Sequence, residues 1–131
     1  MAEYLSVALL AIMIFYSFGI AINVHKTLDK ESAGKLLRRL FPIYFLWGLF
    51  ISILAEIIFL LNARQEQAFI MALIVIGYFY SRQILVPKIN KSRDLANEGD
   101  ERSKKDFNSL HFQSVAINLV QMLLLTIILF I

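Results

Sequence analysis

The stretch from Tyr4 to Val24 reads YLSVALLAIMIFYSFGIAINV and contains no formally charged residue. At the helical rise of ~1.5 Å per residue it would be about 31 Å long, which matches a hydrocarbon core of ~30 Å. We therefore predict that this stretch crosses a membrane as a helix. It lacks the basic start and the small-residue cleavage site of a signal peptide, so we expect a retained span.

Three further apolar runs follow, at residues 41–61, 68–86 and 107–131. With 59% hydrophobic and 18% charged residues, the chain is too apolar for a soluble domain of 131 residues. The sequence predicts an all-α fold, a four-helix transmembrane bundle of up-down topology. Residues 1–131 are expected to form this single membrane domain, with spans at about 4–24, 41–61, 68–86 and 107–131.

Lysine and arginine are unevenly distributed between the two ends of the predicted bundle. Of the 13 lysines and arginines, all but Arg64 and Arg82 lie in the segments that join the first span to the second and the third to the fourth. The positive-inside rule therefore predicts that both segments are cytoplasmic and that both termini are non-cytoplasmic. Because the charges flank apolar runs, the net charge of +3 indicates a membrane surface and not nucleic acid.

The first basic segment has the periodicity of a short amphipathic helix at residues 30–40. Apolar residues recur there at helical spacing, namely Ala33, Leu36, Leu37, Leu40 and Phe41. Lys35, Arg38 and Arg39 lie between them. This pattern predicts a helix lying in the membrane interface, with a basic face that binds anionic lipid headgroups.

The second basic segment carries the signals of a turn and of a helix start. Residues 97–100, Asn-Glu-Gly-Asp, predict a turn. Ser103 and Asp106 have the spacing of a capping box, which predicts that the fourth helix begins beside them.

Polar side chains within the spans are informative, because each buried polar group in lipid must find a partner. Four of them share one stripe of the fourth span: His111, Ser114, Asn118 and Gln121. Polar residues also lie near the cytoplasmic ends of the other spans: Asn23, His25, Tyr44 and Arg82. We predict that all eight converge on one polar cluster, which either links the helices by hydrogen bonds or binds an anionic or planar ligand.

Small residues predict where the helices approach one another closely. The second span places Gly48, Ser52 and Ala55 on the face that also carries Tyr44, and the third span offers Gly77 and Ser81. On the first span, Tyr16, Gly19 and Asn23 are expected to share a face.

The chain contains no recognisable catalytic constellation, such as a glycine-rich phosphate loop or paired carboxylates, so no enzyme activity and no catalytic residue are predicted. Cysteine is absent and neither histidine has carboxylate neighbours, so no metal site is predicted. No cofactor is expected, although His25 and His111, on different helices at similar depth, could together ligate a haem b iron.

Several short motifs resemble known families. They are AG at 33–34, LFPIYF at 40–45, PKI at 87–89, RD at 93–94 and FxxLHxxSxxxN at 107–118. On these motifs the chain resembles the bacterial domain of unknown function 4149, and it is similar to the eukaryotic transmembrane protein 205 family. The resemblance implies a compact four-helix domain of the bacterial inner membrane without an established reaction, in which His111, Ser114 and Asn118 act as a unit.

The resemblance also implies an association with tolerance to a platinum drug for the eukaryotic relative, and a distant similarity to copper-resistance and haem-binding proteins. This chain departs from the copper-resistance and haem-binding proteins because no histidine lies deep within its first span.

Three functions remain open. They are a non-catalytic binding or accessory subunit of a larger membrane complex or homo-oligomer, a haem- or redox-linked protein using His25 and His111, and a metal or drug tolerance factor with transporter-like behaviour.

Overall fold

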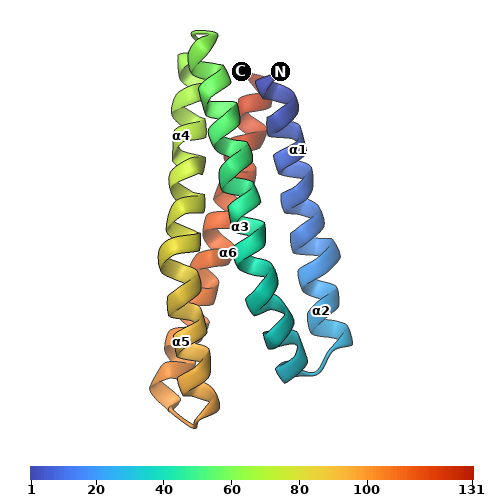
Figure 1. Ribbon diagram of the computed structural model, residues 1–131, viewed down its shortest axis with the longest axis vertical. Helices are drawn as coiled ribbons and strands as arrows, with labels where there is room; N and C mark the ends of the chain where they lie inside the picture. Colours follow the sequence, from blue (N-terminus) through green and yellow to red (C-terminus); the bar gives the residue numbers. More distant parts are fainter.

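The structure, a computed structural model, describes residues 1–131 and consists of helices joined by short turns. Four continuous helical rods are each long and apolar enough to cross a membrane, at Ala2–Thr27, Lys30–Leu61, Gln65–Asn97 and Glu101–Phe130. Successive rods run in opposite directions, so both termini lie at one end of the bundle (Figure 1). The predicted all-α, up-down four-helix fold is confirmed.

Two of the four rods contain a π-helical stretch. The first rod comprises α1 (Ala2–Ile14), the π-helical η1 (Phe15–Ala21) and α2 (Ile22–Thr27), and the second is α3 (Lys30–Leu61). The third comprises α4 (Gln65–Tyr80), the π-helical η2 (Ser81–Leu85) and α5 (Val86–Asn97), and the fourth is α6 (Glu101–Phe130). A π-helical turn holds more residues than an α-helical one, so side chains beyond it are rotated about the helix axis.

The small residues of α3 lie at close helix contacts, and Gly48 lies against α4. Ser52 and Ala55 are fully buried, and a Cβ atom on Gly48 would lie only 2.2 Å from Cε1 of Tyr78. Gly77 packs against α6, where a Cβ atom would lie 2.7 Å from Nε2 of Gln121. These close contacts fix α3, α4 and α6 together in the middle of the bundle.

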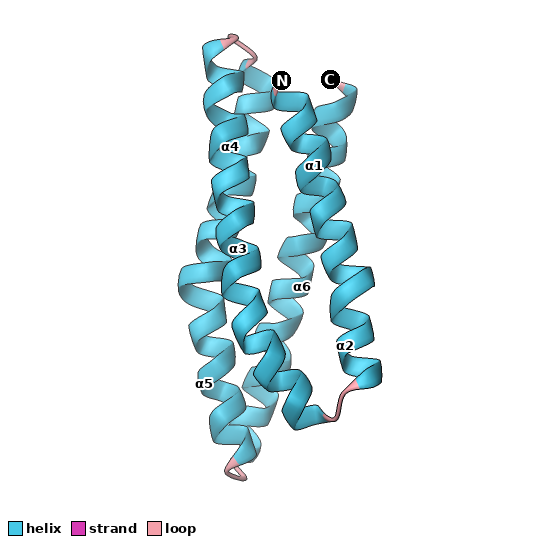
Figure 2. Ribbon diagram, turned by 45° about the vertical axis from the view of Figure 1, so that its right-hand side comes forward, coloured by secondary structure: helices cyan, strands magenta, loops and turns pink.

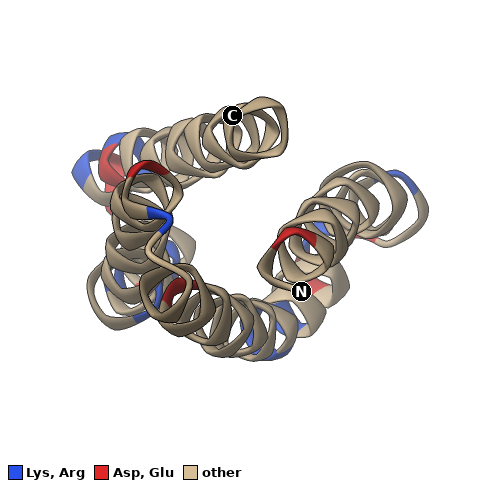
Figure 3. Ribbon diagram, turned by 90° about the horizontal axis from the view of Figure 1, so that it is seen from above, with Lys and Arg blue, Asp and Glu red and all other residues tan.

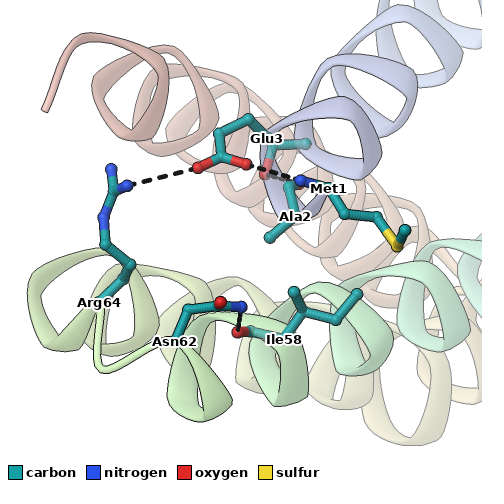
Figure 4. Close-up of polar contacts among 7 residues, drawn as sticks. Met1, Ala2, Glu3, Ile58, Asn62 and Arg64 are labelled. Atoms are coloured by element: carbon teal, nitrogen blue, oxygen red, sulfur yellow. Dashed lines mark hydrogen bonds and ion pairs between the residues drawn. The ribbon is translucent and has the colours of Figure 1, made fainter.

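The end of the bundle that holds both termini, here called the terminal end, is tied by polar contacts (Figure 4). Glu3 of α1 lies 3.6 Å from Nη1 of Arg64 in the α3–α4 turn, and it also accepts a bond from the amino group of Met1. Asn62 donates a 2.7 Å hydrogen bond to the carbonyl oxygen of Ile58, which satisfies one of the last carbonyls of α3.

The opposite end, here called the basic end, contains the α2–α3 loop and the α5–α6 turn. Asp29 caps α3 by accepting 3.0 Å hydrogen bonds from the backbone N–H groups of Glu31 and Ser32. The hydrogen bonds from Ser32 lower the pKa of the Asp29 carboxyl, because they stabilise its charged form. The cap therefore stays charged at neutral pH.

The α5–α6 turn confirms one sequence prediction and corrects another. α5 ends at Asn97, and Gly99 has a φ of +98°, a value that glycine adopts without strain. The predicted capping box of Ser103 and Asp106 is wrong, because α6 begins three residues earlier. Asp100 caps it by accepting from the backbone N–H and the hydroxyl of Ser103, and these bonds lower the pKa of the Asp100 carboxyl.

The predicted interface helix at residues 30–40 also needs correction. The segment is helical, but it is the first part of α3, which continues through Pro42 to Leu61 without a break. Ala33 and Leu37 are each only 1% exposed, since the third rod lies alongside this part of α3. Ala33 and Leu37 on the apolar side of the segment are therefore buried against protein and not against lipid, while Leu36 stays 38% exposed.

Candidate functional site

A cavity of about 380 Å³ lies between the first rod, α3 and α6, on the basic side of the bundle's middle. It exists because α1 packs against α6 near the termini, whereas α2 makes no substantial contact with α6. The two helices diverge toward the basic end (Figure 2), and the view along the bundle shows an incomplete ring of helices that is open on this side (Figure 3). We call this space the lateral cavity.

The lateral cavity has an apolar body and opens sideways. Nine of its 14 lining residues are hydrophobic. Several of these also remain exposed on the outside of the bundle, including Phe18 on η1 at 57%, and Val115 and Leu119 on α6 at 44% and 50%. Since these residues belong to membrane spans, the mouth of the cavity faces the hydrocarbon of the bilayer.

Three polar side chains on three rods meet at the wall of the lateral cavity. Nδ2 of Asn118 on α6 donates a 2.8 Å hydrogen bond to the hydroxyl of Tyr44 on α3. The ring of Tyr16 on η1 stacks on the ring of Tyr44, with centroids 4.1 Å apart and an interplanar angle of 15°. The predicted interhelical bonding of Tyr44 and Asn118 therefore exists, and it joins the second and fourth rods.

Two polar atoms in this wall are buried without a hydrogen-bond partner. They are the hydroxyl of Tyr16 and Oδ1 of Asn118, the end of the amide that does not bond to Tyr44. An unpartnered buried polar group costs about 1–3 kcal/mol, so a hydrogen-bond partner would stabilise both atoms, although each has less than 1 Å² of surface accessible from the cavity.

His25 on α2 and His111 on α6 both line the lateral cavity, but neither forms a hydrogen bond. The predicted hydrogen bonds between the first and fourth helices are therefore wrong for His25 and His111, because α2 and α6 diverge where these residues lie. His111 instead stacks on Phe107, with ring centroids 6.0 Å apart.

Arg93 of α5 supports the His111 side of the cavity. Its guanidinium carbon lies 5.2 Å from the centroid of the Phe107 ring, and its Nη1 donates a 3.1 Å bond to the carbonyl oxygen of Gly34 on α3. Through Arg93, Phe107 and His111, the third rod is connected to both α3 and α6 at the basic end.

The remaining residues of the predicted cluster are distributed differently from the prediction. Ser114 lines the cavity beside Asn118. Gln121 donates a 2.9 Å bond to the carbonyl oxygen of Ile74 on α4, and Asn23 donates a 2.8 Å bond to Gly19 of its own rod. Arg82 lies on η2 and does not line the cavity.

The three basic residues predicted to face lipid headgroups are mostly paired within the protein. Lys35 lies 2.6 Å from Glu31 of the same helix, and Arg38 lies 2.5 Å from Asp94 of α5. Arg38 also bonds to the carbonyl oxygen of Asn90 at 3.2 Å. Only Arg39 of the three makes no ion pair, so this face carries less free positive charge than the sequence predicts.

The sequence matches the model of the family described as "Domain of unknown function (DUF4149)" over residues 5–98. The matched range contains η1 and α3, which form two walls of the lateral cavity, and ends before α6. No curated protein and no solved structure matches the chain.

Proposed function

The chain belongs to the DUF4149 family, and from that premise we propose that it is a non-catalytic binding protein of the membrane. In this proposal the lateral cavity holds an amphipathic molecule that enters sideways from the bilayer, and the protein serves as a binding or accessory subunit. The observation that carries the proposal is an apolar cavity, open toward lipid, whose wall contains two buried polar atoms without a partner.

The polar groups of the cavity define the class of ligand. The Tyr16 hydroxyl can donate or accept, and the free end of the Asn118 amide needs a polar partner. His25 and His111 add two imidazoles toward the basic end of the cavity. A molecule with a long apolar body and an uncharged head that both donates and accepts hydrogen bonds suits these groups, as an uncharged lipid with a free hydroxyl or an isoprenoid with a hydroxyl-bearing ring does.

Filling the lateral cavity should remove the ligand. Ala21 of η1 lines the cavity, so Ala21→Phe places a ring inside it. We expect native mass spectrometry of the protein in mild detergent to detect a bound small molecule on the wild type and at least about tenfold less on the variant, because the apolar volume is lost.

Ala8→Phe is the matched control, since Ala8 is an exposed residue of the same rod that does not line the cavity. It should retain the ligand fully. Equal retention by both variants, or a wild type that carries no small molecule above the level of bulk detergent and lipid, would refute the proposal.

A haem- or redox-linked role is the second candidate, because His25 and His111 line the same cavity from different rods. It makes a distinct prediction for the same purified protein. A ligated haem gives a Soret absorbance band that both His25→Ala and His111→Ala abolish, whereas the binding role proposed here requires no chromophore.

The orientation in the membrane forms part of the proposal. The basic end carries the α2–α3 loop and the α5–α6 turn, and the positive-inside rule places such loops in the cytoplasm of a bacterial inner membrane. A reporter that is active only outside the cytoplasm should therefore work when fused after Ile131 and fail when inserted at Gly99. The reverse result would invert the topology.

A further inference from the structure

A second hollow, of about 310 Å³, lies between α5 and α6 at the basic end and is separate from the lateral cavity. Six residues line it: Lys88, Lys91, Ser92, Asp106, Ser109 and Leu110. Each helix contributes three residues at i, i+3 and i+4, the spacing of one helix face. α5 and α6 pack along their length as an antiparallel pair joined by the turn at Gly99. We call this hollow the hairpin groove.

The hairpin groove is lined almost wholly by polar groups, most of them hydrogen-bond donors. Lys88 and Lys91 are exposed, and neither takes part in an ion pair. The hydroxyls of Ser92 and Ser109 add two more donors, while Asp106 is the one anionic side chain. Two cations elsewhere at this end have internal partners, since Lys35 pairs with Glu31 and Arg38 with Asp94. The groove therefore offers two uncommitted ammonium groups to a ligand.

The position of the hairpin groove along the helices indicates that its ligand comes from the lipid headgroup layer. The third apolar run ends at Val86, two residues before Lys88, and the fourth begins at Phe107, between Asp106 and Ser109. The groove thus lies where both helices leave the hydrocarbon, at the depth of lipid phosphates. Leu110, its single hydrophobic residue, lies on the membrane side.

We infer that the hairpin groove binds the phosphate group of an anionic phospholipid, with Lys88 and Lys91 as its cationic contacts and Ser92 and Ser109 as its hydroxyl donors. Basic pockets between membrane helices are suited to such headgroups, because each cation near the surface attracts them. The site differs from the basic face of α3, where two of the three cations are neutralised within the protein.

The test compares charge-matched variants in nanodiscs of phosphatidylcholine that contain a minor amount of phosphatidylglycerol. Lys88→Gln with Lys91→Gln removes both cations of the groove, and Lys104→Gln with Lys105→Gln removes the same charge from exposed residues of α6 outside it. Retention of phosphatidylglycerol, measured by native mass spectrometry, should fall on the order of tenfold for the first pair and change less than about twofold for the second. Asp106→Asn, which removes the opposing carboxylate, should increase retention.

Equal losses in both double variants would overturn the inference, since they would indicate a general charge effect. A separate titration with inorganic phosphate alone, on protein in neutral detergent, distinguishes the two sources of phosphate. The inference requires that this titration detect no binding, and saturable phosphate binding that depends on Lys88 and Lys91 would assign the groove to free phosphate instead. Unchanged thermal unfolding of each variant serves as the folding control.

Discussion

Gly48→Ala should destabilise the bundle by about 2 kcal/mol or more, the largest single-residue effect that we expect. The added Cβ would lie 2.2 Å from Cε1 and 2.4 Å from Cζ of Tyr78. That ring is completely buried and packs near the rings of Tyr44 and Phe45, so it has no free space into which to move. Helices α3 and α4 must separate instead, and the free energy of unfolding in detergent should fall accordingly.

Gly34→Ala is the control for Gly48→Ala, because it makes the same change on the same helix. Its added Cβ would meet nothing closer than 3.7 Å, an ordinary contact with Nη1 of Arg93. We expect this variant to be close to the wild type in stability, with a small gain from the higher helix propensity of alanine. Tyr78→Leu should also reduce the cost of Gly48→Ala in a double-mutant cycle. Equal stability of both alanine variants would refute the close α3–α4 packing.

Arg93→Gln should destabilise the protein by about 1–2 kcal/mol, mainly by loosening the basic end. The variant loses the 3.1 Å bond to the carbonyl oxygen of Gly34 and the contact of the guanidinium with the Phe107 ring. Relief of the repulsion between Arg93 and Arg38 offsets part of this loss. Hydrogen exchange should become faster in α5 and in the first turns of α3, while the terminal end stays protected.

Arg102→Gln provides the comparison for Arg93→Gln. Arg102 is an exposed arginine of α6, in the same hairpin, and it forms no side-chain hydrogen bond or ion pair. Its replacement should leave both stability and hydrogen exchange near those of the wild type. If Arg93→Gln behaves in the same way, then Arg93 does not hold the rods together.

The spans and their packing faces could be predicted from the sequence because both depend on local patterns. Uncharged apolar length identifies a span, and small residues at four-residue spacing identify a close contact. Gly48, Ser52 and Ala55 lie where that pattern places them. The stripe on α6 also faces inward as predicted, although Asn118 bonds to α3 and Gln121 to α4.

The π-helical stretches explain one failure of the sequence prediction. A spacing of 3.6 residues per turn puts Tyr16, Gly19 and Asn23 on one face, but η1 begins at Phe15 and changes this spacing. Tyr16 is consequently buried at the cavity wall, whereas Asn23 is exposed and bonds to its own rod. No residue pattern in the apolar first span signals this change of helix type.

The lateral cavity could not be predicted because it depends on how far two rods diverge. The sequence places His25 and His111 at similar depth, and depth alone suggests that they meet. In the structure α1 contacts α6 while α2 does not, so the same residues become opposite walls of a cavity. The ion pair of Arg38 cannot be predicted from local patterns either, since Arg38 reaches Asp94 across 56 residues of sequence.

Photocrosslinking inside a native-like bilayer tests the central claim most directly. A photoreactive amino acid at Val115, which is 44% exposed, lies at the mouth of the lateral cavity. The same amino acid at Val120, which is 53% exposed, lies on α6 outside the cavity. If the cavity holds a specific amphipathic molecule, Val115 should crosslink mainly to one species, strongly enriched over its share of the membrane, while Val120 samples the bulk lipids. The same bulk lipid profile at both positions would contradict the account.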